Sequence, residues 1–485
     1  MRAIALSVML LLAAGHASAA DGVLCVQQQL TALGFAPGPA DGALGGRTFA
    51  AAELFAANAK LELPKLEEAT ADRWCSEITA FAQTPAARTL STLDLVSEPP
   101  GVLSADKQQA QWDAYKGAKA CLSNSVYAAG TAQEVRKLTP EHFAAVAWTS
   151  PFTPTRGSRL CSTLPGATTP PAAISKVKLD ERYGERVASV DAASDWFRRM
   201  ATFLRYSSDP AAATLLKRAV IDWAQSDGLG EGIRVSWGER PVDYQMMTAI
   251  ASILAATAEI APEFTAEERQ VVGPWLNQLV RQVGASSWKD RQDNKTDMRT
   301  YIALLWGLMV GDDQAVQDAI FTYKLAIHDM RPDGSWPIDS QRGGSGLDYN
   351  SSATRGVVMI AVALKQARNI DLFDYAVEGR SVHDAVAWVV RTIEDPYTTN
   401  PIYAVPCPDS GDRWGTIEGP SMNFINEAGY LRAYAALFPT QPASMVIEGK
   451  LSRKIGRQSD AIGGAAACQF ALEGGTPTFE ALQLP

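Results

Sequence analysis

The sequence is poor in histidine and in net positive charge, and its cysteines are far apart. Only four histidines occur among 485 residues, and no two of the six cysteines have the Cys-x-x-Cys spacing. Structural zinc sites are usually built from such spacings, so metal binding is disfavoured. The formal net charge of −9 argues against nucleic acid as a partner. No residue pattern implies a redox cofactor, and we expect no cofactor at all.

Long apolar runs are also absent after the first twenty residues, so we expect no membrane span. The N-terminus has the pattern of an export signal, with Arg2 as the charged start, an apolar stretch at residues 4–14, and the small-residue sequence Ala17-Ser18-Ala19. This stretch is too short to cross a bilayer. We therefore expect residues 1–20 to be a signal peptide and the mature protein to be periplasmic or secreted.

An even number of cysteines in an exported chain favours disulfide bonds. Six cysteines allow 15 pairings. Their clustering along the chain favours three local bridges. The expected bridges are Cys25 with Cys75, Cys121 with Cys161, and Cys407 with Cys468.

A short motif near the N-terminus combines glycine and proline turns with helical sequence. Its elements are Gln27-Gln28-Gln29-Leu30, Leu33-Gly34-Phe35, Pro37-Gly38-Pro39, Asp41-Gly42 and Arg47-Thr48. The turn residues fix a tight connection between two amphipathic helices. The pattern resembles the peptidoglycan-binding module, a small three-helix fold. The resemblance implies such a module at residues 21–80 and a contact with peptidoglycan or the cell wall, although these modules also serve as scaffolds.

The rest of the chain divides by composition. Residues 81–180 contain a Pro/Thr/Ser-rich part and one predicted helix at 105–120, and we interpret them as linker and wrapping segments. Residues 181–485 carry long stretches in which apolar residues recur at helical spacing, so this part is predicted to be nearly all α-helix. The predicted helices are 191–206, 210–226, 244–260, 265–283, 298–310, 312–330, 352–368 and 382–393.

Two polar segments stand out within this helical region. One contains Asn294 and Lys295, and the other leads from Asp333 through Arg342 to Tyr349. Together they supply an amide, two cations and a phenol. This set suits removal of a proton beside a carboxylate, because Asn and Arg can neutralise the carboxylate while Tyr exchanges protons.

The order and spacing of these residues resemble the alginate lyase family of polysaccharide lyases, which have an Asn-His pair followed by an Arg and a Tyr seven residues apart. The resemblance implies an all-α fold, an (α/α) toroid or incomplete α/α barrel. It also implies β-elimination of a uronic-acid polymer such as alginate, with Asn294, Lys295, Arg342 and Tyr349 as catalytic residues. Lys295 stands where the family has histidine.

Each of these residues also has an ordinary structural interpretation. Asn294 can cap a helix, Arg342 can be a solvated charge, and Tyr349 can be a half-buried packing residue. Two roles remain open for Lys295. It either pairs with the substrate carboxylate while Tyr349 makes both proton transfers, which we prefer, or it acts as a base with a lowered pKa.

Other polar and aromatic residues suggest a groove for an anionic polysaccharide. Lys289, Arg291, Lys295 and Arg299 cluster in one segment, although a solvated helix face would have the same sequence. The residues expected to bind substrate are Trp237, Arg240, Tyr244, Trp288, Arg291 and Trp336. The histidines His142, His328 and His383 lie in or beside apolar patterns and are expected to have ordinary structural roles.

Two other functions compete with the lyase. An (α/α) toroid glycoside hydrolase would use a pair of carboxylates, with candidates at Asp333, Asp339, Asp348 and Glu418. A non-catalytic cell-wall or glycan-binding protein would account for the N-terminal module and for Lys295.

Overall fold

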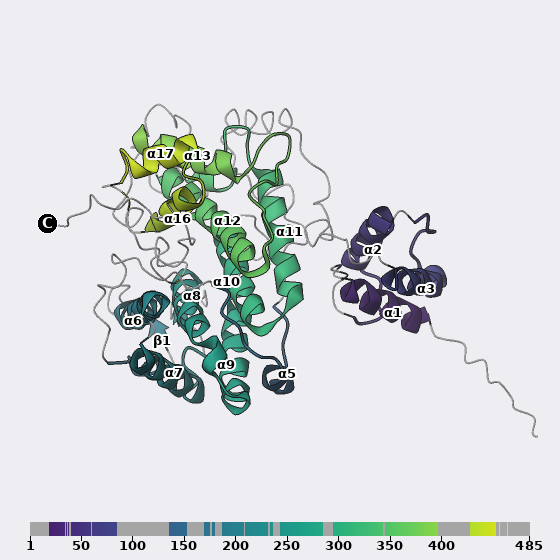
Figure 1. The fold of residues 1–485 in the computed structure, drawn as a ribbon, viewed down its shortest axis with the longest axis horizontal. Coiled ribbons are helices and arrows are strands. Elements are labelled where there is room, and N and C mark those ends of the chain that lie inside the picture. Colours follow the sequence, from purple (N-terminus) through teal and green to yellow (C-terminus); the bar gives the residue numbers. More distant parts are fainter. Residues whose placement is uncertain are drawn as a thin grey trace, which may run out of the picture. The chain divides into compact units, whose positions relative to one another are not determined.

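The structure is a computed structural model, and the chain falls into two compact units, residues 1–97 and 98–485 (Figure 1). The structure describes residues 19–33, 35, 37, 40–59, 61–84, 135–152, 169–174, 177–179, 187–207, 209–230, 233–235, 243–284, 294–342, 345–395, 427–452, 455 and 463. The predicted helix at 105–120 therefore lies outside the described residues.

The first unit contains three α-helices and one 3₁₀ turn among its described residues. They are α1 (Ala19–Ala32), α2 (Gly46–Ala59), η1 (Glu68–Thr70) and α3 (Ala71–Ala82). Its core is built from fully buried side chains of all three helices, including Val26, Phe55 and Ile78. The predicted three-helix fold of this unit is confirmed.

Two features tie the connections of this unit to its core. The Gln27 side chain on α1 is buried. Its amide donates to Asp41 Oδ1 at 3.1 Å and accepts from the Gly42 backbone N–H at 2.9 Å. These bonds fix the predicted Asp41-Gly42 turn to α1. Cys25 and Cys75 form a disulfide between α1 and α3, with a Cα–Cα distance of 5.7 Å. This predicted pairing is confirmed, and the other four cysteines lie outside the described residues.

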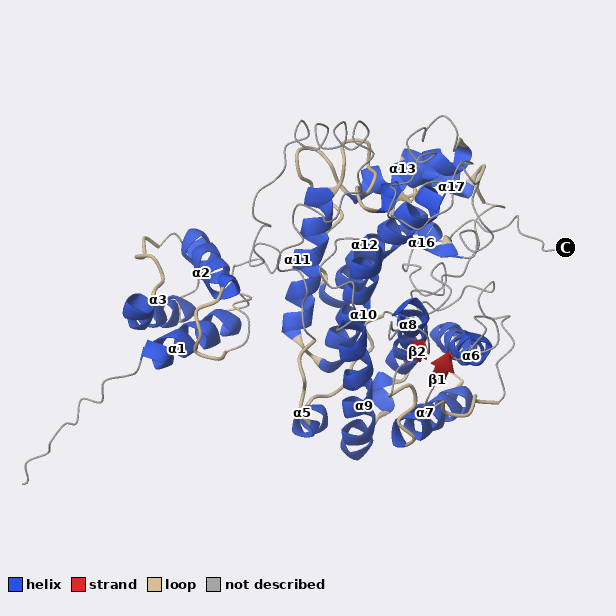
Figure 2. Ribbon diagram, turned by 180° about the vertical axis from the view of Figure 1, so that it is seen from behind, coloured by secondary structure: helices blue, strands red, loops and turns tan. Residues whose placement is uncertain are grey.

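The second unit is built from consecutive pairs of helices (Figure 2). The pairs within its described residues are α6 (Val187–Tyr206) with α7 (Pro210–Gln225), α8 (Asp243–Glu259) with α9 (Ala266–Gly284), α10 (Asn294–Val310) with α11 (Asp313–Asp329), α12 (Gly346–Arg368) with α13 (Val382–Glu394), and α16 (Gly429–Leu437) with α17 (Pro442–Glu448). The first helix of each pair packs against the first helix of the next, from α6 through α8, α10 and α12 to α16. This arrangement confirms the predicted all-α toroid.

Three helices start earlier than their apolar pattern predicts. α6 begins at Val187, α10 at Asn294 and α12 at Gly346, which is four to six residues before the predicted starts. In α10 and α12 the added turns are polar, but several of their side chains are buried, including Asn294, Asp297 and Asn350. A pattern of apolar residues therefore cannot detect these turns. These turns form the N-terminal ends of α10 and α12, which carry the candidate site. We call the first helix of each pair (α6, α8, α10, α12 and α16) an inner helix.

Several smaller elements were not predicted. Residues 135–152 lie against α9 and α10 and include α5 (Pro140–Ala145). Thr139 caps the start of α5, and its hydroxyl accepts from the His142 N–H at 3.3 Å. Two three-residue strands, β1 (Val177–Leu179) and β2 (Ile233–Val235), form a parallel pair. The remaining 3₁₀ turns are η3 (Ala261–Glu263) and η4 (Asp339–Gln341). The strands are too short to produce an alternating sequence pattern.

No helix in the part of the chain that the structure describes is long and apolar enough to cross a membrane.

Candidate functional site

The directions of the inner helices bring the predicted catalytic residues to one end of the second unit. Gly311 and Asp312 form the short turn from α10 into α11. Arg368, the last residue of α12, donates to Asp313 Oδ1, at the first residue of α11, at 3.0 Å. The C-terminal ends of α10 and α12 therefore meet at the start of α11. It follows that α10 and α12 are parallel and that their N-terminal ends lie together at the opposite end.

The other inner helices follow the same direction. Arg205, near the end of α6, forms a buried ion pair with Glu259 at the end of α8. Trp148 then links the C-terminal ends of α8 and α10, since its ring lies 5.5 Å from Phe264 and 5.9 Å from Trp306, measured between centroids. The N-terminal ends of α8, α10 and α12 therefore face the same way. Asn294 and Lys295 lie at this end of α10, Tyr349 lies at this end of α12, and Arg342 lies just before α12.

Asn294 and Lys295 are the first two residues of α10. Asn294 is 7 % exposed and Lys295 is half-buried. Arg299, one turn further on, is also buried and donates from Nη2 to Thr296 Oγ1 at 2.9 Å. A solvated helix face is therefore wrong for Arg299. Lys289 and Arg291 lie outside the described residues.

Arg342 and Tyr349 form a close pair across the start of α12. Arg342 Nη2 donates to the Tyr349 hydroxyl at 2.8 Å, and its guanidinium carbon lies 3.8 Å from the centre of the Tyr349 ring. The cation thus stacks on the ring and also reaches its hydroxyl. Both side chains are half-buried. A cation bound to a phenol favours the phenolate, which is the form that can accept a proton.

The segment between α11 and Arg342 is held in place by residues that follow α12. Residues 369–381 run back along α11, where Tyr323 of α11 donates to the Leu372 carbonyl at 2.8 Å and Arg380 donates to the Met330 carbonyl. Arg391 of α13 donates to the Asp333 carbonyl at 3.1 Å. Gly334 has a φ of +91°, and a Cβ there would strike the Asp384 backbone oxygen. Glycine is therefore required at this turn.

α10 and α12 approach each other closely just beyond the candidate residues. A Cβ at Gly356 would lie 2.5 Å from Asp297 Cβ and 3.0 Å from the Asp297 carbonyl carbon. Asp297 is three residues after Asn294, and Gly356 is seven after Tyr349. The glycine therefore sets how close these two helix ends lie. A glycine inside a helical pattern was the only sequence signal for this contact.

Buried tyrosines elsewhere in this unit are poor candidates for proton transfer. Burial raises the pKa of Tyr301, Tyr323, Tyr430 and Tyr434, although the hydrogen bond with Ser351 at 3.0 Å partly opposes this for Tyr430. These phenols stay protonated at neutral pH. Tyr349 differs because it is half-buried and contacts a guanidinium group.

The three histidines have the structural contacts expected for them. His142 contacts the Val310 carbonyl at 3.2 Å, His328 contacts the Tyr375 hydroxyl at 2.8 Å, and His383 contacts the Tyr434 hydroxyl at 2.6 Å. Burial lowers the pKa of His383, which therefore favours the neutral form. Within the described residues, no group of three or more His, Cys, Asp or Glu side chains is arranged to hold a metal ion.

The predicted substrate-binding residues have different outcomes. Trp336 is 4 % exposed, and its indole N–H donates to Thr354 Oγ1 at 2.9 Å. Trp336 is therefore part of the core, and the expectation that it stacks on a sugar is wrong. Tyr244 lies in the first turn of α8, but its side chain is not described. The residues outside the described part are Trp237, Arg240, Trp288 and Arg291.

The carboxylates considered for a hydrolase have different surroundings in the structure. Asp333 Oδ1 accepts from the Ser335 N–H at 2.9 Å and from its hydroxyl at 2.6 Å, which assigns this carboxylate to a turn. Asp339 is buried and Asp348 is half-buried. Glu418 lies outside the described residues.

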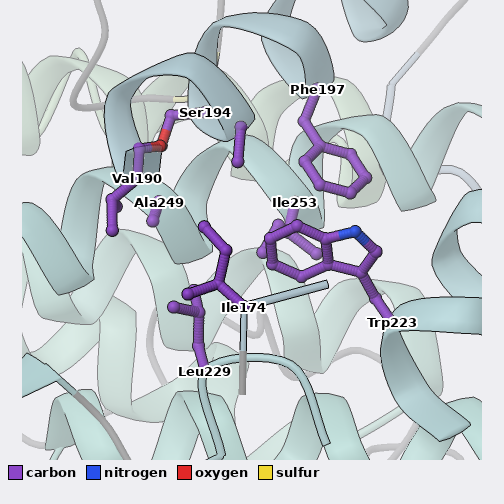
Figure 3. A pocket seen from close by; sticks show the side chains of 9 residues that line it. Ile174, Val190, Ser194, Phe197, Trp223, Leu229, Ala249 and Ile253 are labelled. Atoms are coloured by element: carbon purple, nitrogen blue, oxygen red, sulfur yellow. The ribbon is translucent and has the colours of Figure 1, made fainter. Parts of the chain in front are cut away.

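A narrow apolar pocket lies between α6, α7 and α8, and none of the candidate catalytic residues lines it (Figure 3). Its lining is almost entirely apolar, with Ser194 as its polar residue, and Phe197 and Trp223 form one wall. It leaves no room for a water molecule. This pocket is a gap in the packing and cannot take a sugar.

Comparison with known proteins connects this geometry to one family. Residues 161–399 match the alginate lyase family model. A polysaccharide lyase of Stenotrophomonas maltophilia (strain K279a) is 27 % identical over 208 residues, and the match covers 42 % of this chain and 61 % of that protein. The match therefore spans less than two thirds of the relative.

Solved structures of alginate lyase A1-III from Sphingomonas species A1 have a similar fold. One matches with a TM-score of 0.53 and 18 % identity, covering 68 % of this chain and 98 % of that chain. A histidine-to-alanine variant of alginate lyase A1-III, complexed with a tetrasaccharide, matches with a TM-score of 0.51 and 17 % identity, covering 72 % of this chain and 94 % of that chain.

Proposed function

We propose that this protein is a polysaccharide lyase that cleaves a uronic-acid polymer by β-elimination, because its residues 161–399 match the alginate lyase family model. The observation that carries the proposal is the contact between Arg342 and Tyr349, in which a guanidinium group donates to the phenol at 2.8 Å. It joins a fixed cation to a proton-transfer group at the end of the toroid where Asn294 and Lys295 also lie.

In the proposed reaction the Tyr349 phenolate removes the proton from the carbon next to the substrate carboxylate. The electron pair forms a carbon–carbon double bond, and the bond to the glycosidic oxygen at the next carbon breaks. Tyr349 then gives the proton to that leaving oxygen. One residue can serve both steps when the proton and the leaving oxygen are on the same face of the sugar.

Asn294, Lys295 and Arg342 are proposed to stabilise the negative charge that builds on the substrate carboxylate. An amide and two cations at a partly buried site are well suited to this, because charge–charge interactions are stronger away from bulk water. Arg342 can both bind a carboxylate oxygen and support the Tyr349 phenolate. Lys295, in place of the family histidine, acts in this proposal as a charge partner.

The substrate proposed is an anionic polyuronate, with alginate or polymannuronate as the first candidates. A tetrasaccharide is bound in solved structures of the similar alginate lyase A1-III, which supports an oligosaccharide ligand for this fold. We also propose that the protein is exported to the periplasm or secreted. The Cys25–Cys75 disulfide supports this, since such bonds persist in oxidising compartments.

The test is to incubate the purified protein with polymannuronate, polyguluronate, glucuronan and pectate and to follow ultraviolet absorbance and reducing ends together. A lyase creates a double bond conjugated with the carboxylate, so both signals rise. A hydrolase would raise reducing ends alone, and a binding protein would raise neither. Either of the last two results on every polymer overturns the proposal.

A further inference from the structure

We propose that Asn350 is a positioning residue that holds Arg342 against Tyr349. The inference rests on the proposed function, because it assigns to Asn350 the geometry on which that reaction depends. Asn350 follows Tyr349 directly in α12 and is fully buried, so its own side chain does not face the substrate.

The Asn350 amide makes hydrogen bonds in three directions. Its Oδ1 accepts from the Trp336 backbone N–H at 2.7 Å. Its Nδ2 donates to the Gly346 carbonyl at 2.8 Å and to Ser340 Oγ at 3.3 Å. One buried side chain therefore ties Trp336 and Ser340, which precede Arg342 in the chain, to the first turn of α12.

Arg342 lies within the segment that Asn350 closes. Ser340 precedes it by two residues and donates its backbone N–H to the Trp336 carbonyl at 2.9 Å. Ser345 follows it and donates its backbone N–H to the Arg342 carbonyl at 3.2 Å. The described residues 335–342 thus form an arch over the Asn350 amide, and Arg342 is the last residue of this arch.

The chemistry of an amide suits this position better than any other side chain of its size. A carboxylate at 350 would keep the acceptor for Trp336 but would face the Gly346 carbonyl with an oxygen instead of a donor. Alanine would leave the Trp336 N–H and the Gly346 carbonyl without this partner, and buried polar groups without partners are costly. Either change loosens the arch rather than the helix bundle.

A displacement of Arg342 should be visible in turnover. Misplacing a catalytic group by about 1 Å can cost on the order of 10²-fold in rate. We therefore expect Asn350→Ala to lower kcat at least about 10-fold with a smaller change in KM, because the substrate is still bound by the rest of the groove.

Asn277 offers a matched control. It is also a buried helical asparagine that holds a neighbouring segment, since its Oδ1 accepts from the Leu138 N–H at 3.1 Å and its Nδ2 donates to the Arg136 carbonyl at 3.0 Å. Its contacts lie where residues 135–152 cover α9, not at the candidate site. Asn277→Ala should lower the melting temperature comparably and leave kcat within about twofold, as expected for a change that affects only stability.

Asn350→Asp supplies a second variant, which keeps the volume of the side chain if the alanine variant does not fold. A protonated Asp regains one donor and carries no buried charge. The ratio of variant to wild-type kcat should therefore rise as the pH is lowered, and Asn277→Asp should show no such trend. A flat ratio for Asn350→Asp would contradict the proposal.

Hydrogen exchange of the full chain separates this inference from the proposed activity. Peptides covering residues 335–342 should lose protection in both Asn350 variants and keep it in both Asn277 variants. Unchanged protection there, or unchanged kcat in folded Asn350→Ala, overturns the positioning role. If the wild-type protein forms no unsaturated product from any polyuronate, the proposed function fails, while the exchange experiment still decides whether Asn350 holds the arch.

Discussion

At the scale of single residues, the candidate site depends on one phenol and the cation stacked on it. Arg342 reaches both the ring and the hydroxyl of Tyr349, whereas the buried tyrosines of the same unit have hydroxyls whose pKa is raised by burial. The difference between these phenols lies in their surroundings, and it singles out Tyr349 as the proton-transfer group in the proposed reaction.

Tyr349→Phe removes only the hydroxyl from this pair. If Tyr349 makes both proton transfers, kcat should fall by about 10²- to 10⁴-fold with KM nearly unchanged. Steady-state ultraviolet assays on the preferred polymer measure this. Tyr323→Phe is the control, because it also loses a buried hydroxyl bond, to the Leu372 carbonyl, but lies on α11. Full turnover by Tyr349→Phe would show that a group other than Tyr349 makes the proton transfers.

Lys295→His restores the residue that the family has at this position. As a charge partner Lys295 should be only partly replaced by a neutral imidazole, so KM at neutral pH should rise while the preferred polymer stays the same. Lys295→Arg, which keeps the charge, should retain most of the affinity. New activity of the histidine variant on the opposite uronate epimer would instead show that this position provides a base.

At the scale of elements, the parallel packing of α10 and α12 brings together residues that are about fifty positions apart in the sequence. The approach at Gly356 leaves no space for a side chain against Asp297. The polar first turns of both helices are covered by neighbouring elements, and this explains why they are helical without an apolar pattern.

Gly356→Ala should separate the N-terminal parts of α10 and α12 and thereby move Asn294 away from Tyr349. We expect a loss of about 1–3 kcal/mol in stability, as for other overpacked sites, together with a fall in kcat. Gly307→Ala is the matched control, because its Cβ would lie 2.5 Å from Ala315 Cβ, at the other end of α10. Thermal unfolding should show similar destabilisation of the two variants. Turnover assays should show a fall in kcat for Gly356→Ala alone.

At the scale of the whole molecule, the two units have separate cores, and the proposed chemistry lies entirely in the second. The first unit has its own disulfide, a core of buried side chains from its three helices, and a turn held by Gln27. A contact with peptidoglycan stays a prediction from its sequence motif.

Deleting residues 21–84, which contain α2, α3 and all but the first two residues of α1, should leave kcat and KM on soluble polymer within about twofold of the full chain, because no residue of the proposed reaction is removed. The measurement is the same ultraviolet assay on a folded, monodisperse variant, with circular dichroism to confirm its helix content. Loss of turnover in such a variant would place part of the groove in the first unit.

The sequence by itself determined the helical fold class, most helix positions in the second unit, the three-helix first unit and the Cys25–Cys75 bridge. The helical fold class, the helix positions and the bridge follow from local patterns, because apolar periodicity and cysteine spacing are read along the chain. The three-helix first unit was implied by its resemblance to the peptidoglycan-binding module. The match to the alginate lyase family agrees with the spacing of Arg342 and Tyr349 that pointed to it.

Only the tertiary structure decided which polar residues are buried and what they hold. The sequence did not reveal the hydrogen bonds of the Asn350 amide, the burial of Trp336, or the close approach of α10 and α12 at Gly356. Each of these depends on a neighbour that is distant along the chain or on a loop that folds back. Polar side chains have no periodic signature when they are satisfied by such contacts. Local patterns therefore specify the helices, while their packing and the connections between them specify the geometry of the site.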